Sequence, residues 1–154
     1  RPELISEAAR RFGSQCIVLS IEAKSRGTGG AGWEAYTDNG REHTGRDVIE
    51  WAQQAVKLGA GEILLTSVDH EGTRKGMDTE LIHAVSDCIN VPVIASGGVG
   101  QTEHITEAIN SGADAVALAD MLHYERASLS EIHDAMRAAG ISVRELAEQL
   151  DSAA

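Results

Sequence analysis

Residues 91–100 have the sequence Val91-Pro92-Val93-Ile94-Ala95-Ser96-Gly97-Gly98-Val99-Gly100, a short apolar run that passes directly into a glycine-rich loop. Three more apolar runs of similar length lie at 15–21, 62–68 and 115–119. Continuous rather than alternating hydrophobicity is typical of strands that are buried on both faces, as in parallel sheets covered by helices. The four runs therefore predict four parallel strands.

Amphipathic segments predict helices before and between these strands. Apolar residues three and four positions apart mark one helix before the first strand and three helices between successive strands. The marking residues are Leu4, Ile5, Ala8, Ala9 and Phe12; Val48, Trp51, Ala52 and Ala55; Leu81, Ile82, Val85 and Cys88; and Ile105, Ala108 and Ile109.

Two closing helices are predicted after the last strand. Ser128 and Ser142 each precede a Glu by three residues, which is the spacing of a capping box. The second of these helices forms a helical tail over 142–154. The order of elements predicts an α/β domain in which a first helix is followed by four strand-helix units.

One connection, from residue 23 to residue 44, is much longer than the others and is rich in glycine. A loop of this length in a compact domain is usually functional, which favours an active-site loop. The alternative is a solvated hairpin, because Asp38-Asn39-Gly40 is also a typical turn sequence.

Composition limits the class of protein. The chain has 154 residues, 42% of them hydrophobic, which fits one domain over 1–154 rather than a disordered chain. It carries 24 acidic residues against 13 Lys and Arg, a net charge of −11, which argues against binding to nucleic acid or to anionic membranes by bulk charge.

The sequence also bears on the localisation of the protein and on its need for a cofactor. No apolar run approaches the roughly 20 residues of a membrane span, and the first residues lack a signal-peptide core, so we expect a cytoplasmic protein. The histidines show no ligand spacing, and we expect no metal and no cofactor. Cys16 and Cys88 lie in apolar contexts and are expected to be buried reduced thiols.

Polar residues and glycines follow each predicted strand at its carboxyl end, where parallel α/β proteins gather their ligand sites. Between a strand and a helix, the sequence Ser96-Gly97-Gly98 lets backbone N–H groups approach an anion, which suggests phosphate. A tight strand-to-helix turn is the alternative explanation. In chain order, the candidate site residues are Glu22 and Lys24; Asp69, Glu71, Gly72 and Thr73; Ser96, Gly97 and Gly98; and Ala119 and Asp120.

Two motifs resemble a known family. These are Thr66-Ser67-Val68-Asp69-His70-Glu71-Gly72-Thr73-Arg74-Lys75-Gly76-Met77-Asp78 and the loop at 93–100, and together they resemble the cyclase subunit of imidazole glycerol phosphate synthase. The resemblance continues at Tyr36-Thr37, 59–65 and 112–115, and it covers nearly the whole chain up to about residue 144. A sister family, the isomerase of the preceding step in histidine synthesis, shares similar loops, but Thr66-Ser67 and Tyr36-Thr37 favour the cyclase.

The resemblance implies a (β/α)8 TIM barrel of which this chain corresponds to the C-terminal half. Such barrels need about 250 residues. The family takes ammonia from a glutaminase partner and acts on a phosphorylated small-molecule substrate, phosphoribosyl-formimino aminoimidazole carboxamide ribotide. Its products are imidazole glycerol phosphate and aminoimidazole carboxamide ribotide. Two Asp residues serve the family as an acid/base pair, and the first belongs to the N-terminal half of the barrel.

The second catalytic Asp of the family falls on Glu22, which keeps the carboxyl group but adds a methylene. A displacement of about 1 Å can cost about a hundredfold in rate. We take Glu22 as the candidate acid/base, with a solvated Glu at a strand end as the alternative.

The ligand residues of the family match this sequence in part. Gly72 and Thr73 match the loop after the second strand, and residues 96–98 match the phosphate loop without departure. We expect Ala119 to lie beside that phosphate, and three more residues to line the cleft: Lys24, Asp69 and Glu71.

The largest departure is Asp120, where the family has a Ser that helps hold the phosphate. Two negative charges a few ångströms apart cost on the order of 1 to 4 kcal/mol at surface-like dielectrics. The cations Lys24, Arg74 and Lys75 either offset part of this repulsion or are only solvated.

Four strands cannot close a barrel, and open strand edges are an aggregation hazard. We therefore expect a second copy or an N-terminal half to complete the barrel. Two functions remain open: a cyclase that is inactive as a lone half, and a non-catalytic or repurposed phosphate-binding half-barrel that forms homodimers.

Overall fold

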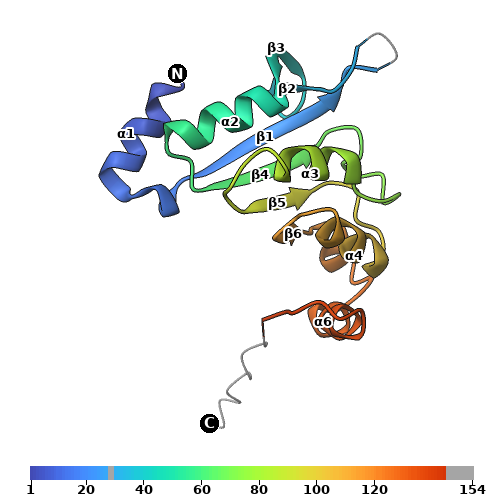
Figure 1. Cartoon of the computed structure of the whole chain (residues 1–154). Helices are drawn as coiled ribbons and strands as arrows, with labels where there is room; N and C mark the ends of the chain where they lie inside the picture. The colour runs from blue at the N-terminus through green and yellow to red at the C-terminus, as the bar shows by residue number, and fades with distance from the viewer. Residues whose placement is uncertain (28–29, 145–154) are drawn as a thin grey trace.

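The computed structural model of the protein describes residues 1–27 and 30–144. Its centre is a six-stranded sheet in the order β3-β2-β1-β4-β5-β6 (Figure 1). Four of the strands run parallel, and they are β1 (Val18–Ser25), β4 (Glu62–Ser67), β5 (Val93–Ser96) and β6 (Ala115–Ala117). These are the four predicted strands, so the prediction is confirmed; β6 ends two residues earlier than the apolar run.

The helices also follow the prediction, except that the short helix α5 and the turn η1 were not predicted. They are α1 (Glu3–Phe12), α2 (Val48–Leu58), α3 (Thr79–Ser86), α4 (Thr102–Asn110), α5 (Asp120–His123) and α6 (Leu129–Ala138), with one 3-10 turn, η1 (Ser14–Cys16). The helix α6 begins at the predicted capping box, in which Ser128 and Glu131 bond each other's backbone N–H. The predicted tail helix over 142–154 lies almost wholly outside the described residues.

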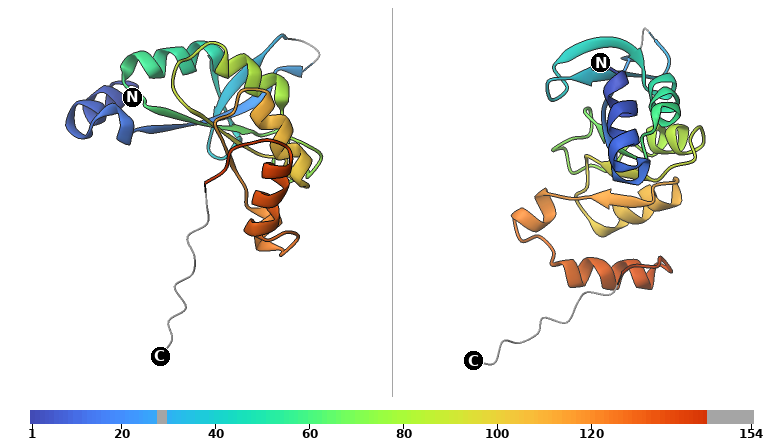
Figure 2. Two further views of the ribbon diagram at one scale, coloured as in Figure 1. Left: turned by 60° about the horizontal axis from the view of Figure 1, so that its bottom comes forward. Right: turned by 90° about the vertical axis from the view of Figure 1, so that its left-hand side faces the viewer.

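The helices α2, α3 and α4 lie on one side of the sheet (Figure 2). Alternate residues point to that side, and they are buried: Ile21, Ile63, Leu65, Val93 and Ala95. The opposite face carries a cross-strand row that is exposed or half-buried, made of Ser20, Leu64, Ile94 and Ala115. The expectation that both faces are buried is therefore wrong for residues 1–27 and 30–144 by themselves, because no layer formed by them covers the second face.

Half of the connection predicted as a loop over 23–44 is strand, so the alternative, a hairpin, is what forms. It consists of β2 (Trp33–Thr37) and β3 (Glu42–Asp47), joined by the turn at Asp38-Asn39-Gly40. The strand β2 pairs antiparallel with β1, but only over residues 22–25 of β1. Within the described part of the chain, residues 18–21 have no strand partner on that side, and Val18 is 49% exposed.

The two cysteines were predicted to be buried, and this is wrong for Cys16. Cys16 is exposed and Cys88 is half-buried, and both are free. Cys16 ends the 3-10 turn η1, two residues before the start of β1 at Val18.

Candidate functional site

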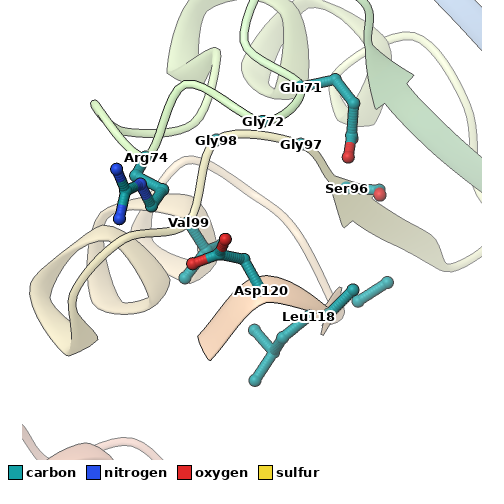
Figure 3. Close-up of a pocket in the computed structure, with 11 residues that line it drawn as sticks. Glu71, Gly72, Arg74, Ser96, Gly97, Gly98, Val99, Leu118 and Asp120 are labelled. Carbon is teal, nitrogen blue, oxygen red and sulfur yellow. The ribbon is translucent and has the colours of Figure 1, made fainter. Parts of the chain in front are cut away.

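Loops at the carboxyl ends of β4, β5 and β6 enclose a pocket of about 160 Å³ (Figure 3). The loop after β5 supplies Ser96, Gly97 and Gly98, and the loop after β6 supplies Ala119 and Asp120. The loop after β4 adds a carboxylate, a glycine and a guanidinium, from Glu71, Gly72 and Arg74. Seven of the sequence-predicted site residues thus line one pocket.

Glycine is required in the β5 loop because two backbones meet there. Gly98 has φ +97°, and a Cβ at this position would lie closer than 3.0 Å to the carbonyl oxygen of Gly76. The N–H of Gly76 donates to the carbonyl of Gly98 at 3.0 Å. His70 Nδ1 donates to the carbonyl of Gly76 at 2.7 Å. The loops after β4 and β5 are therefore locked together by main-chain contacts.

His104 supports the same loop from the first turn of α4. It is a buried side chain, and its Nδ1 accepts the backbone N–H of Gly100 at 3.2 Å. Because Nδ1 accepts this bond, the proton of the neutral ring lies on Nε2. No sequence pattern indicates this role, since a single His at the start of a helix has many uses.

Asp120 faces the pocket and is not a lone charge. It is the first residue of α5, and Arg126 Nε donates to its Oδ1 at 2.8 Å. Arg126, which no sequence pattern marks, therefore pairs with this carboxylate, and the repulsion of phosphate by Asp120 stays a prediction.

Glu22 lies on the open face of the sheet rather than in the pocket. Its cross-strand partner on β4 is Thr66, whose own partner on β5 is Ser96, so the three side chains share one face. The carboxylate Oε2 of Glu22 accepts the backbone N–H of Gly40 in the turn of the hairpin. The hairpin thus holds the candidate acid/base in place along the row that leads to the glycine loop at 96–98.

Three other predicted site residues do not line the pocket. Asp69 accepts the backbone N–H of Ser25 at 2.8 Å and so ties the end of β1 to the β4 loop. Thr73 Oγ1 donates to the carbonyl of His70 at 2.7 Å. Lys24 Nζ lies 5.5 Å from the ring centroid of Tyr36. Asp69 and Thr73 therefore act within the chain, and their role toward a ligand stays a prediction.

Asp78 was not predicted, although it fastens the hairpin to the site. Its carboxylate accepts Trp33 Nε1 at 3.2 Å and Ser67 Oγ at 3.3 Å, and it caps α3 through the N–H of Leu81 at 3.0 Å. An Asp three residues before an apolar helical residue is a usable signal for the cap, but nothing in the sequence indicates the bond to Trp33.

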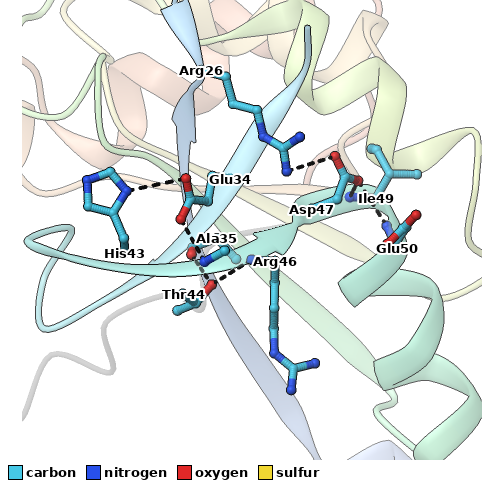
Figure 4. Close-up of polar contacts among 10 residues, drawn as sticks. Arg26, Glu34, Ala35, His43, Thr44, Arg46, Asp47, Ile49 and Glu50 are labelled. Carbon is cyan, nitrogen blue, oxygen red and sulfur yellow. Dashed lines mark hydrogen bonds and ion pairs between the residues drawn. The ribbon is translucent and has the colours of Figure 1, made fainter. Parts of the chain in front are cut away.

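A second set of polar contacts stiffens the hairpin itself (Figure 4). Glu34 accepts the N–H of Gly45 at 2.7 Å and lies 3.3 Å from His43 Nδ1. The hydrogen bond from Gly45 holds the pKa of the Glu34 carboxyl below its usual value. Arg26 pairs with Asp47 at 3.5 Å, and Asp47 in turn caps α2.

The described residues contain neither a metal-binding cluster nor a membrane-spanning helix. Over residues 1–27 and 30–144, no group of His, Cys, Asp and Glu is placed to hold a metal ion. In the same part of the chain, no helix is long and apolar enough to cross a membrane.

Comparison with known proteins shows the family to which the chain belongs. The family described as "Histidine biosynthesis protein" matches residues 1–128. The chain belongs to this family. It is 49% identical, over 148 residues, to a protein called imidazole glycerol phosphate synthase subunit HisF in two strains of Mycobacterium leprae, Br4923 and TN. The match covers 94% of this chain and 57% of each relative, so the chain spans little more than half the length of those relatives.

Membership in the histidine biosynthesis family confirms the resemblance deduced from residues 66–78 and 93–100. It also fits the observed architecture of four parallel strand-helix units with a preceding helix, half of a TIM barrel. By the resemblance, Glu22 and Asp120 are two of the positions at the site where this chain differs from the cyclase pattern, and Asp120 is bonded to Arg126.

Proposed function

We propose that this chain forms the C-terminal half of a cyclase site for histidine biosynthesis in the cytoplasm, and that it is inactive alone. The reaction is that of a lyase: ammonia and phosphoribosyl-formimino aminoimidazole carboxamide ribotide give imidazole glycerol phosphate and aminoimidazole carboxamide ribotide. The observation that most directly supports this proposal is the pocket in which the backbone of residues 96–98 meets the loops after β4 and β6. Its size and its backbone donors suit one phosphate group of the substrate.

Glu22 supplies one carboxylate for acid/base work in this proposal. It stands on the same face as Thr66 and Ser96, and a substrate phosphate in the pocket leaves the rest of the molecule extended along that row. General acid-base catalysis of ring closure needs a second group for the opposite proton transfer. That group comes from the other half of the barrel, which explains why the lone chain is inactive.

The strand edges and the sheet face that the described chain leaves uncovered indicate which partners it needs. The unpaired edge of β1 at residues 18–21 and the outer edge of β6 need strands beside them, and the exposed row Ser20, Leu64, Ile94 and Ala115 needs a facing layer. An N-terminal half-barrel or a second copy of this chain meets both needs. A glutaminase subunit supplies the ammonia to the completed barrel.

A second candidate function is a non-catalytic phosphate-binding half-barrel that forms homodimers. The observation in its favour is the pair of departures at the site, Glu22 and Asp120, since each changes a group that the cyclase uses directly. In this case phosphate still binds to the glycine loop, but no turnover follows.

The two functions are separated by an assay of ammonia-dependent cyclisation with and without an added N-terminal half-barrel. We expect turnover only in the mixture, and we expect Glu22→Gln in the same mixture to abolish it. Turnover by the lone chain would contradict its inactivity, and absence of turnover in a mixture that forms a stable complex favours the non-catalytic function. Light scattering tests the pairing: a stable monomer in dilute solution rules out the homodimer.

A further inference from the structure

Arg126 reaches Asp120, a residue that lines the pocket, because the chain folds back after α5. Tyr124 N–H donates to the carbonyl of Asp120 at 3.0 Å, and Arg126 N–H donates to the carbonyl of Met121 at 2.8 Å. Between them, Glu125 has φ +49°, a left-handed conformation that reverses the chain. The side chain of Arg126 is thereby returned to the first residue of the helix, where it meets the carboxylate of Asp120.

The guanidinium of Arg126 has N–H donors that no residue of the described chain uses. Its Nε bonds Asp120, while neither Nη group has a hydrogen bond or ion pair with any residue of the described chain. The ring of Tyr124 covers one side of the group, with Cζ 5.2 Å from the ring centroid. The side chain is 40% exposed. Asp120 and Tyr124 thus fix the direction of a guanidinium whose outer edge is open.

We propose that Arg126 is a phosphate-binding residue of this protein and that Asp120 is the positioning residue that holds it at the pocket. This inference rests on the proposed function, because it assumes phosphate at residues 96–98. When phosphate enters, Nε keeps its bond to Asp120, and the Nη groups donate to phosphate oxygens. Arg is suited to this task because its planar fork matches phosphate oxygens and stays charged at every accessible pH.

The charges around the pocket support this assignment. Its lining includes two carboxylates, Glu71 and Asp120, and one guanidinium, Arg74. With those three alone the formal charge is −1, which opposes a phosphate; with Arg126 added it is zero. Where the cyclase pattern has a neutral Ser at position 120, this chain has an Asp-Arg pair that restores neutrality and adds two directed donors.

The test is a titration of the full-length ¹⁵N-labelled chain with inorganic phosphate, followed through the amide signals of Gly97 and Gly98. We expect Arg126→Gln to weaken binding about tenfold or more, as for the loss of a charge-assisted contact. The matched control is Arg137→Gln, which removes the same charge from an equivalent pair, Arg137 with Asp134 at 3.0 Å on α6. It should change binding by less than about twofold, because salt screens a charge that is not at the pocket.

The deciding comparison is made in a chain without Asp120. In Asp120→Ser, we expect the added Arg126→Gln to weaken phosphate binding about fivefold or more, since a direct donor is lost. If the double variant binds phosphate as tightly as Asp120→Ser, Arg126 only offsets the charge of Asp120 and the proposal is overturned. If phosphate moves neither amide signal in the wild type or in Asp120→Ser, the phosphate site itself is refuted, and the role of Arg126 with it.

Discussion

The contact between the loops after β4 and β5 predicts a large effect of Gly98→Ala. The new Cβ would lie closer than 3.0 Å to the carbonyl oxygen of Gly76, and 3.1 Å from the Cβ of His70. The clash is with backbone and cannot be relieved by rotating a side chain. To make room, the loops must separate, which breaks the 3.0 Å hydrogen bond from Gly76 N–H to the carbonyl of Gly98.

The expected decrease in the free energy of unfolding of Gly98→Ala has two parts. A non-glycine residue at φ +97° costs roughly 1 to 2 kcal/mol. Overpacking against a fixed backbone typically adds 1 to 3 kcal/mol. We therefore expect Gly98→Ala to lower the free energy of unfolding by about 3 kcal/mol and to weaken phosphate binding at residues 96–98, because the backbone donors move.

Gly72→Ala is the matched control, because Gly72 lines the same pocket with φ +71° and has nothing within 4 Å of an added Cβ. It carries the conformational cost without the clash. The two variants should differ by about 2 kcal/mol, which corresponds to about 4 to 8 °C in Tm for a chain of this size. Calorimetry and the phosphate titration are run on both. Equal melting temperatures and equal phosphate affinities for the two variants would refute the locked-loop geometry.

Three further predictions concern other parts of the chain. Glu22→Asp shortens the candidate acid/base to the length found in the cyclase, and should raise cyclisation in the two-half mixture by up to about a hundredfold; an unchanged rate would mean that Glu22 already reaches the substrate. Cys16 should react with a thiol reagent before Cys88, because it is exposed and burial raises the pKa of the Cys88 thiol; equal labelling rates would contradict this difference in exposure. Hydrogen bonds from Ser128 lower the pKa of the Glu131 carboxyl. The stabilisation of the folded chain by this cap is therefore fully present above the usual pKa of 4.5, and it is lost as the pH falls through the lower pKa of the folded state. Urea unfolding from pH 6 to pH 3 should show the wild type losing stability relative to Glu131→Gln, and parallel curves would contradict this.

The strands and the phosphate loop were predictable because each is encoded locally. An apolar run such as 91–95 can be buried in few ways, and glycines directly after it allow a main-chain approach that other residues forbid. The capping box at Ser128 is equally local, since both partners lie within one helical turn. In each case the sequence contains the whole interaction within a few residues.

The contacts that could not be predicted join residues that no short sequence pattern connects. The hairpin is held by Asp78 across 45 positions from Trp33, and no spacing rule connects the two. Arg126 is only six residues from Asp120, but their bond needs the left-handed turn at Glu125, a conformation that Glu seldom adopts. The repulsion expected from Asp120 therefore leaves out a cation, because the partner of Asp120 is not visible in the sequence.

The exposed sheet face and the incomplete acid/base set have one physical cause. The row Ser20, Leu64, Ile94 and Ala115 and the carboxylate of Glu22 lie on the same open face, so whatever covers the row also brings groups toward Glu22. An N-terminal half would place its own carboxylate there. A second copy related by a two-fold axis would instead place a second Glu22 and a second loop of residues 96–98 across the opening. A partner that covers the open face would consequently also complete the acid/base set of the proposed site. A partner that stabilises the chain without changing the surroundings of Glu22 would have to bind to another surface.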